Sequence, residues 1–131
     1  MKYVFRALPA VLVMALIFYF SSQTGDDLNS LFPLFQRWFP GMNNFDWGHF
    51  VAYFILALAY LIAFPKDMRN MKVKVMVVLF CFLYGLTDEF HQSFVGERTP
   101  DAKDLRNDTI GAGIAMLISS ISPVKRWLHK L

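Results

Sequence analysis

Hydrophobic and polar residues alternate in long blocks along this chain. Four apolar segments cover residues 4–20, 47–64, 73–91 and 104–122, and more polar stretches separate them. A helix that crosses a bilayer needs about 20 predominantly apolar residues. The fourth segment reaches that length only because its helix is expected to begin in a polar stretch, near Asp104. The pattern predicts an all-α integral membrane four-helix bundle, formed by a single domain over residues 1–131.

The first apolar segment has two interpretations. Lys2 and Arg6 give it a basic start, as in a cleaved signal peptide. The Ser-Ser-Gln-Thr sequence after Phe20, however, lacks the pair of small residues that marks a cleavage site. We therefore favour a helix that stays in the protein as a membrane anchor.

Residues 21–46 connect the first two segments and carry a helical pattern of their own. Apolar side chains recur there at helical spacing: Leu28, Leu31, Phe32, Phe35, Trp38 and Phe39. Pro40 and Gly41 would end such a helix. We interpret this stretch as a short amphipathic helix on the membrane surface, with Trp38 at the level of the lipid head groups. A lid packed over the bundle is the alternative.

Composition supports the membrane class and argues against nucleic-acid binding. The chain is 56% hydrophobic and 18% charged, whereas a soluble domain has about 25% charged residues. The formal net charge is +3. The basic residues flank the apolar segments instead of forming one stripe among aromatic residues, so we expect no nucleic-acid partner.

The distribution of Lys and Arg predicts the orientation in the membrane. Nine of them lie on the side of the two termini: Lys2, Arg6, Lys66, Arg69, Lys72, Lys74, Lys125, Arg126 and Lys130. Four lie on the other side: Arg37, Arg98, Lys103 and Arg106. Because cytoplasmic loops carry the excess of positive charge, both termini are expected inside, with the protein multi-pass in a bacterial plasma membrane. The basic loop 66–74 would also attract anionic lipids.

With this orientation, every segment brings polar residues to the outer membrane interface. The candidate site residues, in chain order, are Gln23, His49, Tyr53, Asp88, Glu89, His91, Gln92, Arg98, Asp104 and Asn107. Ionisable groups beside apolar helices are costly without partners and call for a functional explanation. Their convergence in one layer predicts a polar pocket at the outer end of the bundle.

Helical spacing refines the pocket. Three pairs share a helix face at intervals of three or four residues: His49 with Tyr53, Asp88 with Gln92, and Asp104 with Asn107. Gly111 and Ala115 continue the last of these faces. Small residues four apart allow close approach of a neighbouring helix.

Four short motifs at these positions resemble the VanZ-like family of small bacterial membrane proteins. They are Phe20-Ser-Ser-Gln23, His49-Phe-x-x-Tyr53, Asp88-Glu-x-x-Gln92 with Phe94 and Arg98, and Asp104-x-x-Asn107 with Gly111. Gly96-Glu97-Arg98 is a slightly altered form of the family's usual Pro-Gly-Arg turn. The resemblance implies low-level resistance to the glycopeptide teicoplanin through an unestablished mechanism at the cell envelope. The partners it suggests are membrane lipids, a lipid-linked cell-wall precursor or the glycopeptide itself.

The pocket residues suit acid–base chemistry or head-group binding. The catalytic candidates are Asp88, Glu89, His49 and His91, which are groups that can accept or donate a proton. The binding candidates are Gln23, Tyr53, Gln92, Arg98, Asp104 and Asn107. A binding protein without turnover is the alternative, and so is an ion-pair network that only holds helix ends together. Whether the protein is an enzyme stays open.

Other classes of site are less well supported. A metal site could draw on His49, Asp88, Glu89, His91 and Asp104, but no compact motif such as His-Glu-x-x-His is present, so we predict no metal. No cofactor can be inferred. A transporter is disfavoured because the middles of the apolar segments carry almost no charge.

Overall fold

The computed structural model describes residues 2–21, 33–34, 36–38, 46–95 and 102–131 of the chain. Its long helices are α1 (Lys2–Ser21), α3 (Asp46–Ala63), α4 (Met71–Gln92) and α5 (Ala102–Ser119). The 3-10 turn η1 (Lys66–Met68) joins α3 to α4, and a short helix, α6 (Ser122–Leu128), follows α5. No strand occurs in the described ranges, which confirms the predicted all-α class.

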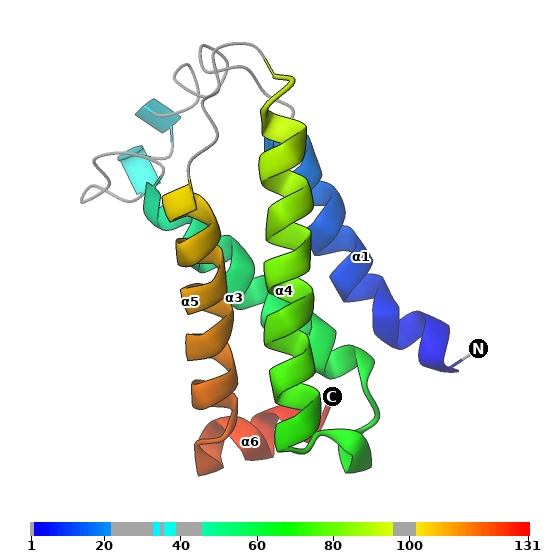
Figure 1. The fold of residues 1–131 in the computed structure, drawn as a ribbon. Helices are drawn as coiled ribbons and strands as arrows, with labels where there is room; N and C mark the ends of the chain where they lie inside the picture. Colours follow the sequence, from blue (N-terminus) through cyan, green and yellow to red (C-terminus); the bar gives the residue numbers. More distant parts are fainter. Residues whose placement is uncertain (1, 22–32, 35, 39–45, 96–101) are drawn as a thin grey trace.

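The long helices pack side by side around α3 (Figure 1). α3 packs most extensively against α5, and it also contacts α1 and α4. In Figure 1 the C-terminus lies at the lower end of the bundle, beside α6 and the turn between α3 and α4, and the start of α1 extends away from the other helices at the lower right. At the upper end, α4 finishes close to where α5 begins. Polar residues near the C-terminus of α4 are thereby brought beside those near the N-terminus of α5.

Proline explains why the fourth apolar segment is divided. The segment was expected to be one helix over 104–122, but α5 ends at Ser119 and α6 begins at Ser122. Pro123 stands in the first turn of α6. Its ring has no N–H and would clash with the Ser119 carbonyl in a continuous helix, whereas a first turn accepts proline. The resulting break turns α6 across the lower end of the bundle, where Leu128 is buried (Figure 1).

A glycine brings α5 against α3 at the centre of the bundle. A Cβ atom added to Gly111 would lie only 2.6 Å from the carbonyl oxygen of Phe50, so the two backbones are in direct contact there. Ala115, one turn further along the same face, is fully buried. These contacts confirm the close helix approach predicted for Gly111 and Ala115. Gly113 points elsewhere, and an added Cβ would meet nothing within 4 Å.

Two expectations concern the membrane. Within the described ranges, no helix combines the length and the hydrophobicity needed to cross a bilayer. Most of the amphipathic stretch expected in 21–46 lies outside the described residues. Residues 33–34 and 36–38 are helical, and their side chains are exposed, Trp38 among them.

Candidate functional site

Polar side chains from three helices are buried near the upper end of the bundle. We call them the buried polar cluster, whose members are Tyr53 of α3, Asp88 and Gln92 of α4, and Asn107 and Asp108 of α5. Groups of this kind are stable away from water only when other polar groups or a ligand satisfy them. All of them except Asp108 were selected as site residues from the sequence.

Asp88 and Gln92 form the α4 side of the cluster. The Gln92 amide donates from Nε2 to Oδ2 of Asp88 over 3.5 Å. This contact matches the helix face that their spacing of four residues predicts. Both side chains are buried, although they lie in the last two turns of α4.

Asp108 forms the α5 side, and it is completely buried. It can approach α4 because Gly85 has no side chain. A Cβ atom at Gly85 would lie 3.0 Å from Oδ2 of Asp108 and 2.9 Å from Cδ1 of Leu105. The glycine therefore makes room for a carboxylate between two packed helices.

Tyr53 is the member of the buried polar cluster that α3 contributes. Its side chain is only 1% exposed, and its hydroxyl has no hydrogen-bond partner among the described residues. Asp108 and Asp88 both lie near enough to act on this phenol electrostatically. Its ring centroid is 6.3 Å from that of Tyr84 on α4. A buried hydroxyl without a partner is costly, so it marks a point where a bound molecule would be stabilised.

Tyr84 and His91 connect α4 to α1 on the other side. The Tyr84 hydroxyl donates to the Met14 carbonyl over 2.7 Å. The His91 ring stacks on Phe18 with a centroid separation of 4.5 Å. His91, a catalytic candidate, thus packs against α1, and its Nδ1 has no hydrogen-bond partner in the described part of the chain. Glu89 and Asp104 are half-buried.

Three other candidates cannot be located. Gln23 and Arg98 lie outside the described residues. His49 belongs to α3 through its backbone, but its side chain is also outside the described part. Four of the predicted site residues are therefore buried in the described part of the bundle, and the chemical argument rests on them. They are Tyr53 on α3, Asp88 and Gln92 on α4, and Asn107 on α5.

Sequence reasoning missed two contributors, and in both cases a helical signal was present. Asp108 is four residues from Asp104 and three before Gly111, on the buried face of α5. Tyr84 is four residues before Asp88 on α4. Tyr84 was not among the candidate site residues, but its hydroxyl donates to the backbone of α1.

The members of the cluster define what it can bind. They offer two carboxylates, two amides and one phenol, none of which carries a positive charge. Carboxylates accept hydrogen bonds from hydroxyl and amino groups, and amides both donate and accept. The set suits a head group rich in hydroxyl or amino groups better than a bare phosphate. In the described ranges, no three His, Cys, Asp or Glu side chains are placed to hold a metal ion.

Comparison with known proteins identifies the family. The VanZ/LLP1 family model matches residues 6–123. An uncharacterized protein of Schizosaccharomyces pombe, C11E3.10, is 32% identical over 84 residues, which are 63% of this chain and 50% of that protein. The match thus spans half the length of the yeast relative. No solved structure matches the chain. Since the family model covers most of the sequence, the chain belongs to the VanZ/LLP1 family.

Proposed function

We propose that the buried polar cluster binds the polar head of a lipid-linked cell-envelope component at the outer face of a bacterial plasma membrane. In this proposal the protein is multi-pass, both termini are cytoplasmic, and head-group binding underlies a contribution to teicoplanin resistance. The observation that carries the proposal is the meeting of Tyr53, Asp88 and Asp108 in a buried position from three different helices. The teicoplanin link rests on the family resemblance.

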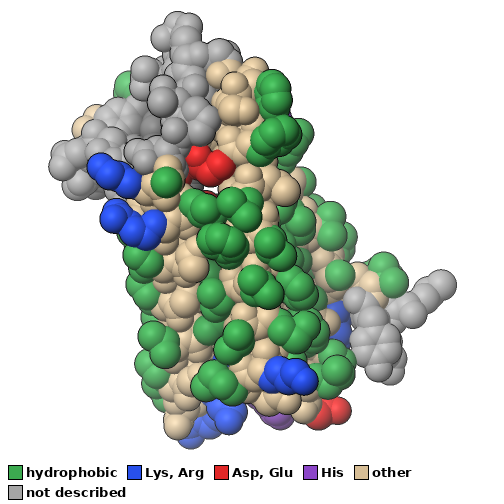
Figure 2. Space-filling model, in the orientation of Figure 1, with side chains coloured by type: hydrophobic (Ala, Val, Ile, Leu, Met, Phe, Trp, Pro, Cys, Tyr) green, Lys and Arg blue, Asp and Glu red, His purple; other side chains and the backbone are tan. Residues whose placement is uncertain are grey.

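Exposed apolar side chains support the membrane location. Figure 2 displays hydrophobic side chains over the middle of the bundle. The exposed apolar side chains of α1, α4 and α5 include Val11, Leu12, Leu16, Val75, Leu79, Leu83, Ile114 and Leu117. Water-soluble monomers rarely expose apolar surface of this extent, whereas lipid tails solvate it well.

The charge distribution supports the orientation. Lys and Arg side chains gather at the lower end in Figure 2, near the N-terminus of α4 and on α6. Two further basic residues, Lys103 and Arg106, are exposed near the N-terminus of α5. By the positive-inside rule the more positive end is expected in the cytoplasm, and this supports an orientation with the buried polar cluster toward the outer leaflet.

The test compares wild type with Asp88→Asn at equal membrane abundance. Asparagine keeps the shape of the side chain but removes its negative charge, so we expect teicoplanin resistance to be lost. Asp67→Asn is the matched control, because Asp67 is exposed in η1 at the opposite end. Retained resistance in Asp88→Asn, or equal loss in both variants, would contradict the proposal.

Lipid extracts of the same cells separate binding from catalysis. A lipid-linked species that is depleted or new only with the wild type would indicate turnover at the cluster. Identical lipid profiles, with resistance lost in Asp88→Asn, would indicate that the head group is bound and not altered. Purified protein incubated with the changed species then tests whether the conversion is direct.

A further inference from the structure

Three polar side chains meet at the lower end of the bundle, where α4, α5 and α6 come together (Figure 1). The Lys74 ammonium of α4 donates to the hydroxyl of Ser120, which directly follows α5, over 2.6 Å. The Ser120 hydroxyl donates in turn to the Met116 carbonyl over 3.1 Å, which fixes its orientation. Lys125 of α6 lies near enough for its charge to act on Lys74. We call Lys74, Ser120 and Lys125 the lower corner.

The positive charge of the lower corner is not balanced inside the described part of the chain. Ser120 is neutral, and neither Lys74 nor Lys125 forms an ion pair with an Asp or Glu side chain among the described residues. Two ammonium groups held near each other repel, and an anion between them turns the repulsion into attraction. The lower corner is therefore an arrangement that a bound anion would stabilise.

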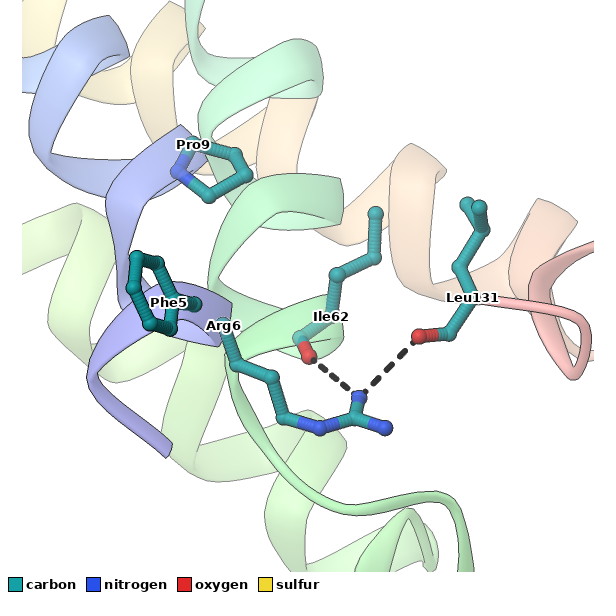
Figure 3. Close-up of a pocket in the computed structure, with 5 residues that line it drawn as sticks. All are labelled: Phe5, Arg6, Pro9, Ile62 and Leu131. Carbon is teal, nitrogen blue, oxygen red and sulfur yellow. Dashed lines mark hydrogen bonds between the residues drawn. The ribbon is translucent and has the colours of Figure 1, made fainter. Parts of the chain in front are cut away.

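The two arginines of this end differ from the lower corner, because backbone oxygens already engage them. Arg6 donates from Nη1 to the oxygens of Ile62 over 3.3 Å and of Leu131 over 3.1 Å (Figure 3). Arg69 donates three hydrogen bonds to backbone carbonyls. Lys74 has one neutral hydroxyl as its partner instead, so it keeps its charge available for a ligand.

An exposed apolar stripe on α5 leads to the lower corner. Ile110, Ile114 and Leu117 follow one another at intervals of four and three residues, so they share one face of the helix. All three are exposed, and Leu117 has 73% of its surface uncovered. Leu117 lies one helical turn before Ser120. Unbalanced positive charge thus stands at the end of an uncovered apolar path.

We propose that the lower corner binds an anionic phospholipid, with its phosphate between Lys74 and Lys125 and an acyl chain along Leu117 and Ile114. Lysine ammonium groups bind phosphate as point charges. The apolar stripe favours a lipid over a free phosphate ion, which would gain nothing from Leu117. The inference rests on the proposed membrane location, and the lipid belongs to the inner leaflet. It goes beyond a general attraction of the basic loop 66–74, because Ser120 and Lys125 come from another part of the chain.

Native mass spectrometry of the purified full chain in neutral detergent micelles measures this binding. Phosphatidylglycerol is titrated against wild type, Lys74→Gln, Lys125→Gln and Leu117→Ser, and inorganic phosphate is added as a competitor. We expect phosphatidylglycerol binding to weaken about fivefold in each lysine variant and about threefold in Leu117→Ser. Lys125→Gln, an exposed position, keeps the test valid if Lys74→Gln fails to fold.

Matched controls decide between a specific site and general charge attraction. Lys72→Gln removes an exposed charge two residues before Lys74, and Arg126→Gln removes the exposed charge next to Lys125. Both controls should bind phosphatidylglycerol like the wild type. Equal weakening in Lys72→Gln and Lys74→Gln would overturn the proposal. So would a Leu117→Ser variant that binds as well as wild type, or inorganic phosphate that competes fully.

A further variant separates this proposal from the one for the buried polar cluster. Asp88→Asn alters the upper end alone, so it should bind phosphatidylglycerol like the wild type whether or not it loses teicoplanin resistance. Failure of either proposal therefore leaves the other one testable by its own readout.

Discussion

At the lower end of the bundle, Arg6 and Arg69 direct their hydrogen bonds to backbone carbonyls, whereas at the upper end buried polar side chains face one another across three helices. The first arrangement completes helix ends that would otherwise lack donors. The second joins side chains of three different helices, and it places Asp108 and Tyr53 where apolar residues would pack at lower cost. Polar side chains that are buried between helices at such a cost are the better candidates for function.

The sharpest test asks whether the two ends face opposite sides of a membrane. Ser93→Cys reports on the upper end and Met68→Cys on the lower end, and both positions are exposed. We expect an impermeant thiol reagent to label Ser93→Cys on intact bacterial cells, and to label Met68→Cys only after permeabilisation. Native Cys81 is buried and should stay unlabelled. The opposite pattern would invert the orientation and place the buried polar cluster inside.

The next largest effect should come from the helix contact that supports the cluster. Gly111→Ala forces a methyl group against the Phe50 carbonyl, at 2.6 Å, and should lower the free energy of unfolding by about 1–3 kcal/mol. Gly113→Ala is the matched control, since its added methyl meets nothing and alanine favours helix by up to about 1 kcal/mol. Thermal unfolding in micelles measures both variants. Equal stability of the two would disprove the close approach of α3 and α5.

A loss of stability of similar size is expected when the lower end is disturbed. The guanidinium group of Arg69 donates three hydrogen bonds, to the carbonyls of Phe64, Ile62 and Leu128. Arg69→Gln removes most of them and should lower the free energy of unfolding by about 2 kcal/mol. Arg126→Gln on α6 removes the same charge from an exposed side chain and should change stability by less than about 0.5 kcal/mol. Teicoplanin resistance should survive in both variants at equal abundance. Loss of teicoplanin resistance in Arg69→Gln but not in Arg126→Gln would indicate that the lower end also has a function.

The smallest changes in stability are expected from substitutions of two tyrosines at the upper end. Tyr84→Phe removes the bond to the Met14 carbonyl and should cost about 1 kcal/mol. Tyr53→Phe removes a buried hydroxyl that has no partner among the described residues, so it should leave stability unchanged or raise it by up to about 1 kcal/mol. Resistance should nonetheless fall in Tyr53→Phe. A destabilised Tyr53→Phe protein would mean that this hydroxyl has a structural role.

Much of the fold could be predicted from the sequence, because long apolar blocks determine where helices form. The division after Ser119 was not predicted, although Pro123 directly follows the fourth apolar segment and proline is well suited to the first turn of a new helix. The close contact at Gly111 was predictable because small residues at a four-residue interval have few other uses between helices.

The site was only partly predictable, for a different reason. Asp88 and Gln92 follow from local spacing, and so does Asp108 in retrospect. The partners of Arg6 do not, since they lie 56 and 125 residues away in the chain. Both are backbone oxygens, and no side-chain pattern could point to them. Arg6 and Arg69 were therefore counted only as signals of orientation.

The contact between Arg6 and Leu131 also has a consequence for the order of events during synthesis. Arg6 leaves the ribosome early, and its partner is made 125 residues later. At usual elongation rates the arginine waits roughly 6 to 25 s for that oxygen. The contact between Arg6 and Leu131 should accordingly form only after α5, with its part of the buried polar cluster, has been made.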